Sequence, residues 1–72
     1  MKNIPALRAR KVAGALRKAG FILLRQRGSH QIYQKGNRLL VIPWHSKDLK
    51  KPTVKAIIDQ SGMTVEEFIK LL

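Results

Sequence analysis

The apolar positions near the start of the chain repeat at helical spacing. The residues that follow the i, i+3, i+4, i+7 order are Ala9, Val12, Ala13 and Leu16. This spacing places their side chains on one face of a helix, and Gly20 supplies the stop signal expected after it. Gly14 lies inside the segment and should cost the helix about 1 kcal/mol relative to alanine. The pattern predicts an amphipathic helix that ends before Gly20.

Three short strand-like runs come next, at residues 21–27, 31–34 and 38–42. Gly28 separates the first two. The Lys-Gly-Asn sequence at 35–37 is a tight turn in which glycine and asparagine can adopt positive φ. Strands joined by such short connections pair with their chain neighbours, so the pattern predicts an antiparallel sheet of three strands.

The third run differs from the other two in its apolar character. It is apolar at every position from Leu39 to Ile42. A strand that is apolar on both faces is typical of one covered from both sides, so we expect this strand to be well covered. Pro43 ends it or occupies an edge position.

Two helices are predicted in the C-terminal third. Val54, Ile57 and Ile58 mark a short helix that follows Pro52-Thr53 and closes at Gly62.

The second of these helices carries its own start signal. Thr64 and Glu67 have the spacing of a capping box, and Met63 with Phe68 has that of a hydrophobic staple. The residues predicted to line its apolar face are Val65, Phe68, Ile69 and Leu72.

The order of elements is therefore α-β-β-β-α with an additional short C-terminal helix. Hairpin-connected strands with amphipathic helices on one face of the sheet define an α+β sandwich of two layers. The length of 72 residues is that of one domain, and no linker, repeat or low-complexity segment divides it. We predict a single domain over residues 1–72.

Charge narrows the choice of partner. The chain has 15 Lys and Arg against 4 Asp and Glu, a net charge of +11, and no acidic residue lies in residues 1–47. A surface of one sign attracts polyanions and repels copies of itself, which favours nucleic acid as the ligand. An acidic partner protein, or solubility alone, is the alternative explanation.

Other features exclude several classes of protein. There is no cysteine, so disulfides and thiolate metal sites are excluded. Only His30 and His45 carry imidazoles, and we expect neither a metal nor another cofactor. No apolar run approaches the roughly 20 residues of a membrane span, and no signal-peptide core is present. We expect a soluble, cytoplasmic protein that does not bind a membrane.

The segment Arg-Gln-Arg-Gly-Ser-His at 25–30 is the best candidate for chemistry. Its histidine, His30, carries an imidazole, a group that can donate or accept a proton. Nearby guanidinium groups can hold phosphate oxygens and stabilise developing negative charge. These are the groups needed for cleavage of RNA by its own 2′-hydroxyl. Composition alone favours the alternative that His30 is an ordinary surface or hydrogen-bonded strand residue.

Several residues around this hairpin are candidates for contacts with RNA. The cations that could bind phosphate are Arg25, Arg27, Lys35 and Arg38. Gly28 either lets the backbone approach a phosphate or serves a sharp turn, and Ser29 either binds phosphate or orders the loop. Tyr33 or Trp44 could stack on a base, although burial in so small a core is the favoured use.

The chain resembles the HicA-type mRNA interferases over nearly its whole length. The segments that carry the resemblance are residues 19–21, 27–33, 41–45, 49–58 and 62. The resemblance implies a fold like that of double-stranded-RNA-binding domains and metal-independent endoribonuclease activity on mRNA. It assigns the catalytic role to His30. For His45, in the Pro-x-His element, a structural or partner contact is favoured over a second catalytic role.

The resemblance also implies a biological setting and a partner. The protein would be the toxin of a type II toxin–antitoxin system, neutralised by a HicB-type antitoxin. We expect a monomer when the protein is free and a hetero-oligomer with the antitoxin. The alternative is a non-catalytic RNA-binding module of the same fold, since a basic domain can bind RNA without cleaving it.

Overall fold

The computed structural model of the chain describes residues 4–44 and 47–72. Its elements are, in order, β1 (Leu7–Arg8), α1 (Ala9–Lys18), β2 (Ile22–Arg27), β3 (His30–Lys35), β4 (Arg38–Pro43), β5 (Asp48–Leu49), α2 (Lys51–Ser61) and α3 (Val65–Lys70). The three predicted helices and the three predicted hairpin strands are all present. The middle strand is longer than predicted, because His30 and Lys35 belong to it.

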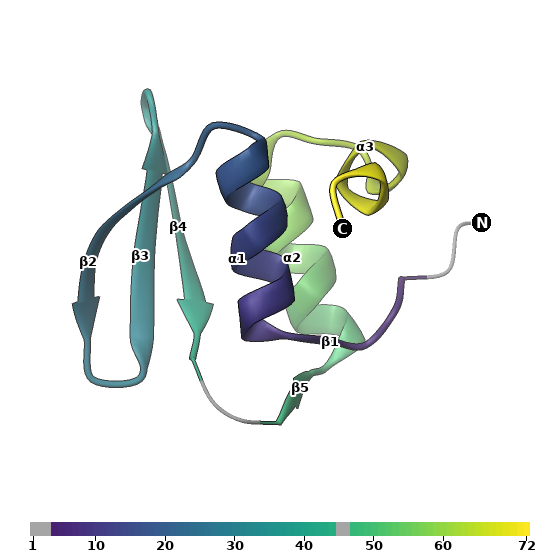
Figure 1. Ribbon diagram of the computed structural model, residues 1–72, viewed down its shortest axis with the longest axis horizontal. Helices are drawn as coiled ribbons and strands as arrows, with labels where there is room; N and C mark the ends of the chain where they lie inside the picture. Colours follow the sequence, from purple (N-terminus) through teal and green to yellow (C-terminus); the bar gives the residue numbers. More distant parts are fainter. Residues whose placement is uncertain (1–3, 45–46) are drawn as a thin grey trace.

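The main sheet has the strand order β2-β3-β4 and is antiparallel throughout. Figure 1 shows α1 and α2 side by side on one face of this sheet, with α3 beyond them. The predicted α+β sandwich with helices on one face is confirmed, and the arrangement is consistent with the fold of double-stranded-RNA-binding domains. The other face of the sheet, called the outer face below, points away from the helices.

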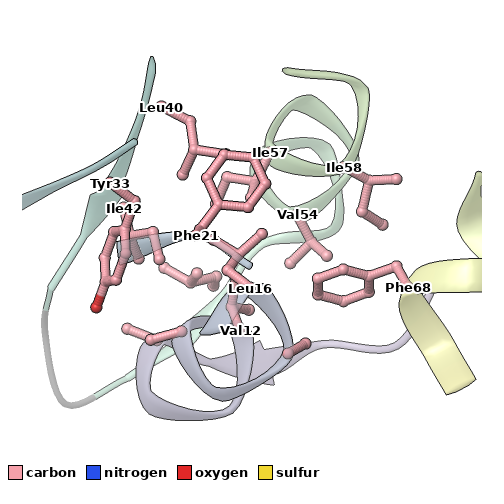
Figure 2. Packing of buried hydrophobic residues seen from close by; sticks show 14 residues of the cluster. Val12, Leu16, Phe21, Tyr33, Leu40, Ile42, Val54, Ile57, Ile58 and Phe68 are labelled. Atoms are coloured by element: carbon pink, nitrogen blue, oxygen red, sulfur yellow. The ribbon is translucent and has the colours of Figure 1, made fainter. Parts of the chain in front are cut away.

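The core lies between the sheet and the helices (Figure 2). Its largest fully buried side chains are Tyr33, Phe68, Leu16, Leu40, Ile42, Leu49, Ile58, Val12 and Val54. Burying a large apolar side chain contributes roughly 1.5–3 kcal/mol, so this single cluster is the main source of stability. Phe21, predicted to be part of the first strand, precedes β2 and is buried in the same cluster.

The predicted covering of the third strand is wrong. In β4, Leu40 and Ile42 are buried, whereas Leu39 is 56% and Val41 43% exposed. Alternate residues of a strand point to opposite faces, and helices cover only one face of this sheet. The apolar residues on the other face of β4 therefore remain accessible to solvent.

Two short strands, β1 and β5, were not predicted. They pair antiparallel, with Leu7 opposite Leu49 and Arg8 opposite Asp48. An ion pair joins the Arg8 Nε and Asp48 Oδ1 atoms at 3.2 Å. Both side chains are largely exposed, so the pair adds at most about 1 kcal/mol. The buried Leu49 side chain is what ties this segment to the core.

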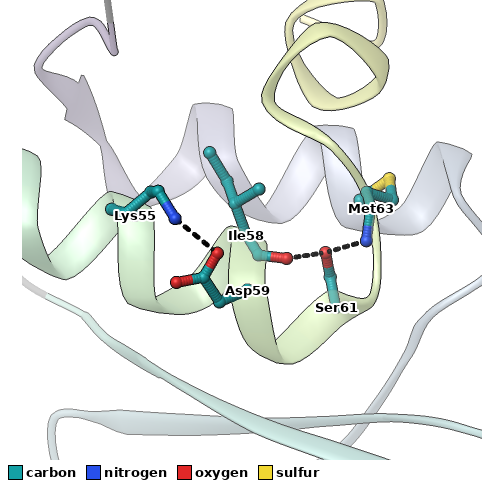
Figure 3. A network of polar contacts seen from close by, with 5 residues as sticks. All are labelled: Lys55, Ile58, Asp59, Ser61 and Met63. Atoms are coloured by element: carbon teal, nitrogen blue, oxygen red, sulfur yellow. Dashed lines mark hydrogen bonds and ion pairs between the residues drawn. The ribbon is translucent and has the colours of Figure 1, made fainter. Parts of the chain in front are cut away.

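The helix α2 ends as the sequence predicts. Gly62 adopts a left-handed conformation with φ of +81° directly after the helix. Figure 3 shows the buried Ser61 hydroxyl donating to the Ile58 carbonyl at 2.5 Å and accepting from the Met63 amide at 3.2 Å. The same view shows the exposed ion pair of Lys55 with Asp59, at 2.6 Å. The two Ser61 contacts define the turn that leads into α3.

The capping box of α3 is confirmed. The Thr64 hydroxyl accepts from the Glu67 amide at 3.1 Å, and the Glu67 carboxylate accepts from the Thr64 amide at 2.9 Å. That backbone hydrogen bond lowers the pKa of Glu67. The predicted apolar face is only partly correct, because Phe68 is buried while Ile69 and Leu72 are 37% and 40% exposed.

Candidate functional site

The predicted site lies at the turn between β2 and β3. Gly28 and Ser29 form the turn, and Arg27 stands directly opposite His30 in the register of the two strands. Gly28 has a φ of +57° and Ser29 does not have a positive φ. This sign pattern is that of a type II′ hairpin turn, which requires glycine at its first position. The sharp-turn role of Gly28 is therefore supported.

The space around Gly28 is open. A Cβ atom added at this position would have no heavy atom within 4 Å. The conformation, rather than crowding, is thus the reason for a glycine here. The turn is therefore open on the side where a Gly28 side chain would lie.

Three rows of residues cross the outer face of the sheet, as the strand register shows. The first row is Ile22, Gln34 and Leu39; the second is Arg25, Ile32 and Val41; the third is Arg27, His30 and Pro43. The face therefore changes along the strands. It is apolar near the β3–β4 turn and basic near the β2–β3 turn, where the histidine lies.

The basic end of this face is accessible. Arg25, Arg27, Ser29 and His30 are all exposed. Within residues 4–44 and 47–72, the side chains of these four residues have no hydrogen bond or ion pair with another residue. An imidazole and two guanidinium groups thus face solvent on one side of one hairpin. No acidic residue lies in the β2–β4 sheet to neutralise them.

Lys35 and Arg38 occupy the opposite end of the sheet. The two face each other across the β3–β4 turn. Lys35 is five positions beyond His30, and at about 3.3 Å per residue the two are about 16 Å apart along the strand. An odd separation in a strand also changes the face, so Lys35 and Arg38 lie on the helix side.

Both of these cations contact the end of a helix. Lys35 Nζ donates to the carbonyl oxygen of Ala19, the C-cap of α1, at 2.6 Å. Arg38 Nη1 donates to the carbonyl oxygen of Gln60 at 3.2 Å, near the C-terminus of α2. Cations at these positions satisfy carbonyl groups that have no partner inside a helix. The structure thus brings together Arg25, Arg27, Gly28, Ser29 and His30 but separates Lys35 and Arg38 from them.

The two aromatic candidates for base stacking, Tyr33 and Trp44, are buried and partly buried, which is the use that the sequence favours. Tyr33 is fully buried, so its ring is not accessible for stacking on a base. Trp44 is partly buried against the core, and its amide donates to the Ser29 carbonyl at 2.5 Å. His45 lies outside the described residues.

Two glutamines next to the turn were not singled out in the sequence. Gln31 is buried, with an exposed fraction of 7%, and it contacts both Tyr33 and Gln26. The signal was present, because period-2 alternation places Gln31 on the same face as the core residue Tyr33. A polar residue on a buried face indicates a hydrogen-bonded role.

Among the residues that the structure describes, no three His, Asp or Glu side chains gather as a possible metal site. No described helix is long and apolar enough to cross a membrane.

These observations define a small basic α+β domain with an exposed histidine between arginines. Comparison with protein families assigns it: the model for "HicA toxin of bacterial toxin-antitoxin" matches residues 9–63 of the 72. The chain therefore belongs to the HicA toxin family, and membership of a toxin–antitoxin family implies an antitoxin partner. The match runs from the start of α1 to the residue after Gly62 and includes the whole β2–β3 turn. A search of curated proteins found no match.

Proposed function

We propose that this protein is a cytoplasmic endoribonuclease toxin that cleaves mRNA without a metal, with His30 as its catalytic residue. The observation that carries the proposal is the exposed pair of His30 and Arg27, opposite each other beside an open turn. Family membership makes a toxic activity the expected outcome. The imidazole–guanidinium pair makes RNA cleavage the activity that fits these residues.

The proposed reaction uses the RNA's own nucleophile. A base removes the proton of the 2′-hydroxyl, whose oxygen forms a bond to the adjacent phosphorus as the bond from phosphorus to the 5′-oxygen breaks. An acid gives that leaving oxygen a proton. His30 serves one or both of these proton transfers, and Arg25 and Arg27 stabilise the negative charge on the phosphorane. The products are a 2′,3′-cyclic phosphate and a 5′-hydroxyl.

The direct test is cleavage of an unstructured RNA by wild type and by His30→Ala. We expect wild-type cleavage in excess EDTA, cyclic-phosphate product ends, and a loss of at least about 10²-fold in rate for the variant. His30 is exposed, so the substitution should leave the thermal unfolding midpoint nearly unchanged. Loss of wild-type activity in EDTA that magnesium restores would contradict the proposal. RNA binding without cleavage would instead identify the protein as a non-catalytic RNA-binding module.

The antitoxin is proposed to be an acidic, HicB-type protein that covers His30. The outer face supports a protein partner as well as RNA, because its basic end adjoins exposed apolar residues, among them Ile22, Leu39 and Val41. Phosphate contacts use only the basic end, whereas a protein can bury both. A second copy of this chain fits poorly, since both copies carry +11. We therefore expect a monomer when the toxin is free.

Substitution of the apolar residues should separate the two ligands. In the double variant Leu39→Thr with Val41→Thr, the β-branched residues keep the strand propensity while removing apolar area. We expect weaker capture by the antitoxin, by about tenfold, and unchanged RNA cleavage. Leu72→Thr, an exposed leucine outside the sheet, is the control. If the antitoxin complex still binds RNA with the affinity of the free toxin, the two ligands do not share this face.

A further inference from the structure

A chain of side-chain hydrogen bonds leads from the core to the β2–β3 turn. The buried Tyr33 hydroxyl donates to Gln31 Oε1 at 2.6 Å. Gln31 Nε2 donates to Gln26 Oε1 at 3.0 Å, and Gln26 Nε2 donates to the Gly28 carbonyl oxygen at 3.0 Å. Gln26 and Gln31 are direct partners in the register of the two strands. We call these three linked side chains, Tyr33, Gln31 and Gln26, the glutamine relay.

The last bond of the glutamine relay determines the orientation of both amides. A carbonyl oxygen only accepts hydrogen bonds, so Gly28 requires the Nε2 group of Gln26 to face it. Gln26 Oε1 then faces Gln31, which must present its own Nε2 group. Gln31 Oε1 is left for the Tyr33 hydroxyl. The relay therefore has one consistent arrangement, in which every donor points toward the turn.

The β2–β3 turn is also held by a backbone hydrogen bond from the residue that follows β4. The amide of Trp44, directly after β4, donates to the Ser29 carbonyl oxygen at 2.5 Å. Both peptide carbonyls of this two-residue turn are thus hydrogen-bonded, one by Gln26 and one by Trp44. His30 is the next residue along the chain. Its backbone position depends on the position of these two peptides.

We infer that Gln26 and Gln31 are positioning residues for His30, which extends the proposed function and rests on it. Tyr33 is fully buried among the core residues and provides a fixed anchor. The relay transmits that fixed position to the turn. His30 itself has no side-chain hydrogen bond within the described part of the chain, so its placement relies on its backbone. Small errors in the placement of a catalytic group cost large factors in rate.

The β3–β4 turn offers a matched control. There, Gln34 Nε2 donates to the Gly36 carbonyl oxygen at 3.3 Å, which is the same contact two residues along the chain. Gly36 has the same φ of +57° as Gly28. Among the described residues, Gln34 has no side-chain hydrogen bond that links it to the core. The β3–β4 turn lies at the end of the sheet opposite the β2–β3 turn (Figure 1). Gln34→Leu therefore removes an equivalent bond where no catalytic residue follows.

The experiment compares Gln26→Leu with Gln34→Leu in steady-state cleavage of an RNA oligonucleotide. We expect kcat to fall by roughly tenfold for Gln26→Leu with KM changed by less than about twofold, and neither to change for Gln34→Leu. Carbonyl ¹³C shifts provide a reading that is independent of activity. The shift of Gly28 should move only in Gln26→Leu, and that of Gly36 only in Gln34→Leu. Gln26→Asn, whose shorter side chain cannot bridge Gln31 and Gly28, should resemble Gln26→Leu.

Three results would overturn this inference. One is an unchanged kcat in Gln26→Leu, which would mean that the relay only provides a hydrogen-bond partner for the buried Tyr33 hydroxyl. Another is an equal loss in Gln34→Leu, which would indicate general weakening of the hairpins. The third is an increase in KM alone, which would make Gln26 a direct RNA contact. If His30→Ala is inactive while Gln26→Leu is fully active, this inference fails and the proposed function stands.

Discussion

The two hairpin turns of the sheet have nearly the same local structure and different surroundings. Each has glycine at its first position with a φ of +57°. Each has a glutamine two residues earlier that donates to the glycine carbonyl. The residues that flank the two turns lie on opposite faces of the sheet. Arg27 and His30 lie on the outer face of the sheet, and Lys35 and Arg38 lie on the helix side.

This difference shows how one kind of turn serves two purposes. At the β3–β4 turn, the flanking cations reach the C-terminal ends of α1 and α2, which lie at the same end of the molecule (Figure 1). At the β2–β3 turn, the flanking residues Arg27 and His30 lie on the outer face and are exposed. Because residues alternate between the two faces of a strand, the number of residues between the turns decides which flanking pair is free for a ligand.

The largest expected effect concerns catalysis. Arg27→Ala should lower kcat/KM for RNA cleavage by roughly 10²-fold, because it removes the cation that we propose stabilises the reacting phosphate. Arg38→Ala should leave kcat/KM nearly unchanged at temperatures where the variant is folded. Parallel cleavage assays of the two variants check this. Equal losses would mean that the separation of the two turns has no functional meaning.

The free energy of unfolding should rank the same two variants in the opposite order, with the larger loss in Arg38→Ala. Arg38→Ala removes the hydrogen bond to the Gln60 carbonyl and a cation from the end of α2, and should cost about 1 kcal/mol of the free energy of unfolding. Arg27→Ala should change that free energy by less than about 0.5 kcal/mol, since its side chain is exposed and without a partner in the described residues. Urea unfolding of both variants measures the difference. A larger loss for Arg27→Ala would reverse the structural assignment.

The smallest effect is on the salt dependence of RNA binding. Each neutralised phosphate of a single strand contributes about −0.7 to the slope of log K against log salt. Arg27→Ala, tested in a His30→Ala background that prevents cleavage, should reduce the slope by about this amount. Arg38→Ala in the same background should not alter it. Binding titrations at several salt concentrations distinguish the two, and an equal reduction would show that Arg38 also contacts phosphate.

Features with a short-range cause could be predicted from the sequence. The period of the apolar residues predicted α1, and the Thr64–Glu67 spacing predicted the capping box, because both patterns act within one or two helical turns. The glycine turns could be predicted because positive φ is a local requirement. The Gly-Ser-His segment at 28–30 and the absence of acidic residues from residues 1–47 are likewise visible directly in the sequence.

The pairing of β1 with β5 could not be predicted. It joins residues 7–8 to residues 48–49, and two-residue strands carry almost no periodic signal. The glutamine relay was missed for a related reason. Its members are each unremarkable in sequence, and only the register of β2 against β3 places Gln26 beside Gln31.

The sequence by itself determined the three helices, the three hairpin strands, their turns, the basic character and the candidate histidine, because those depend on neighbours along the chain. The tertiary structure decided which face of the sheet the helices cover. In β4 both faces are apolar, so the pattern could not distinguish Leu40 and Ile42, which are buried, from Leu39 and Val41, which are exposed. Packing of α1 and α2 made that choice, and it placed Lys35 and Arg38 at helix ends while leaving Arg27 and His30 on the open face.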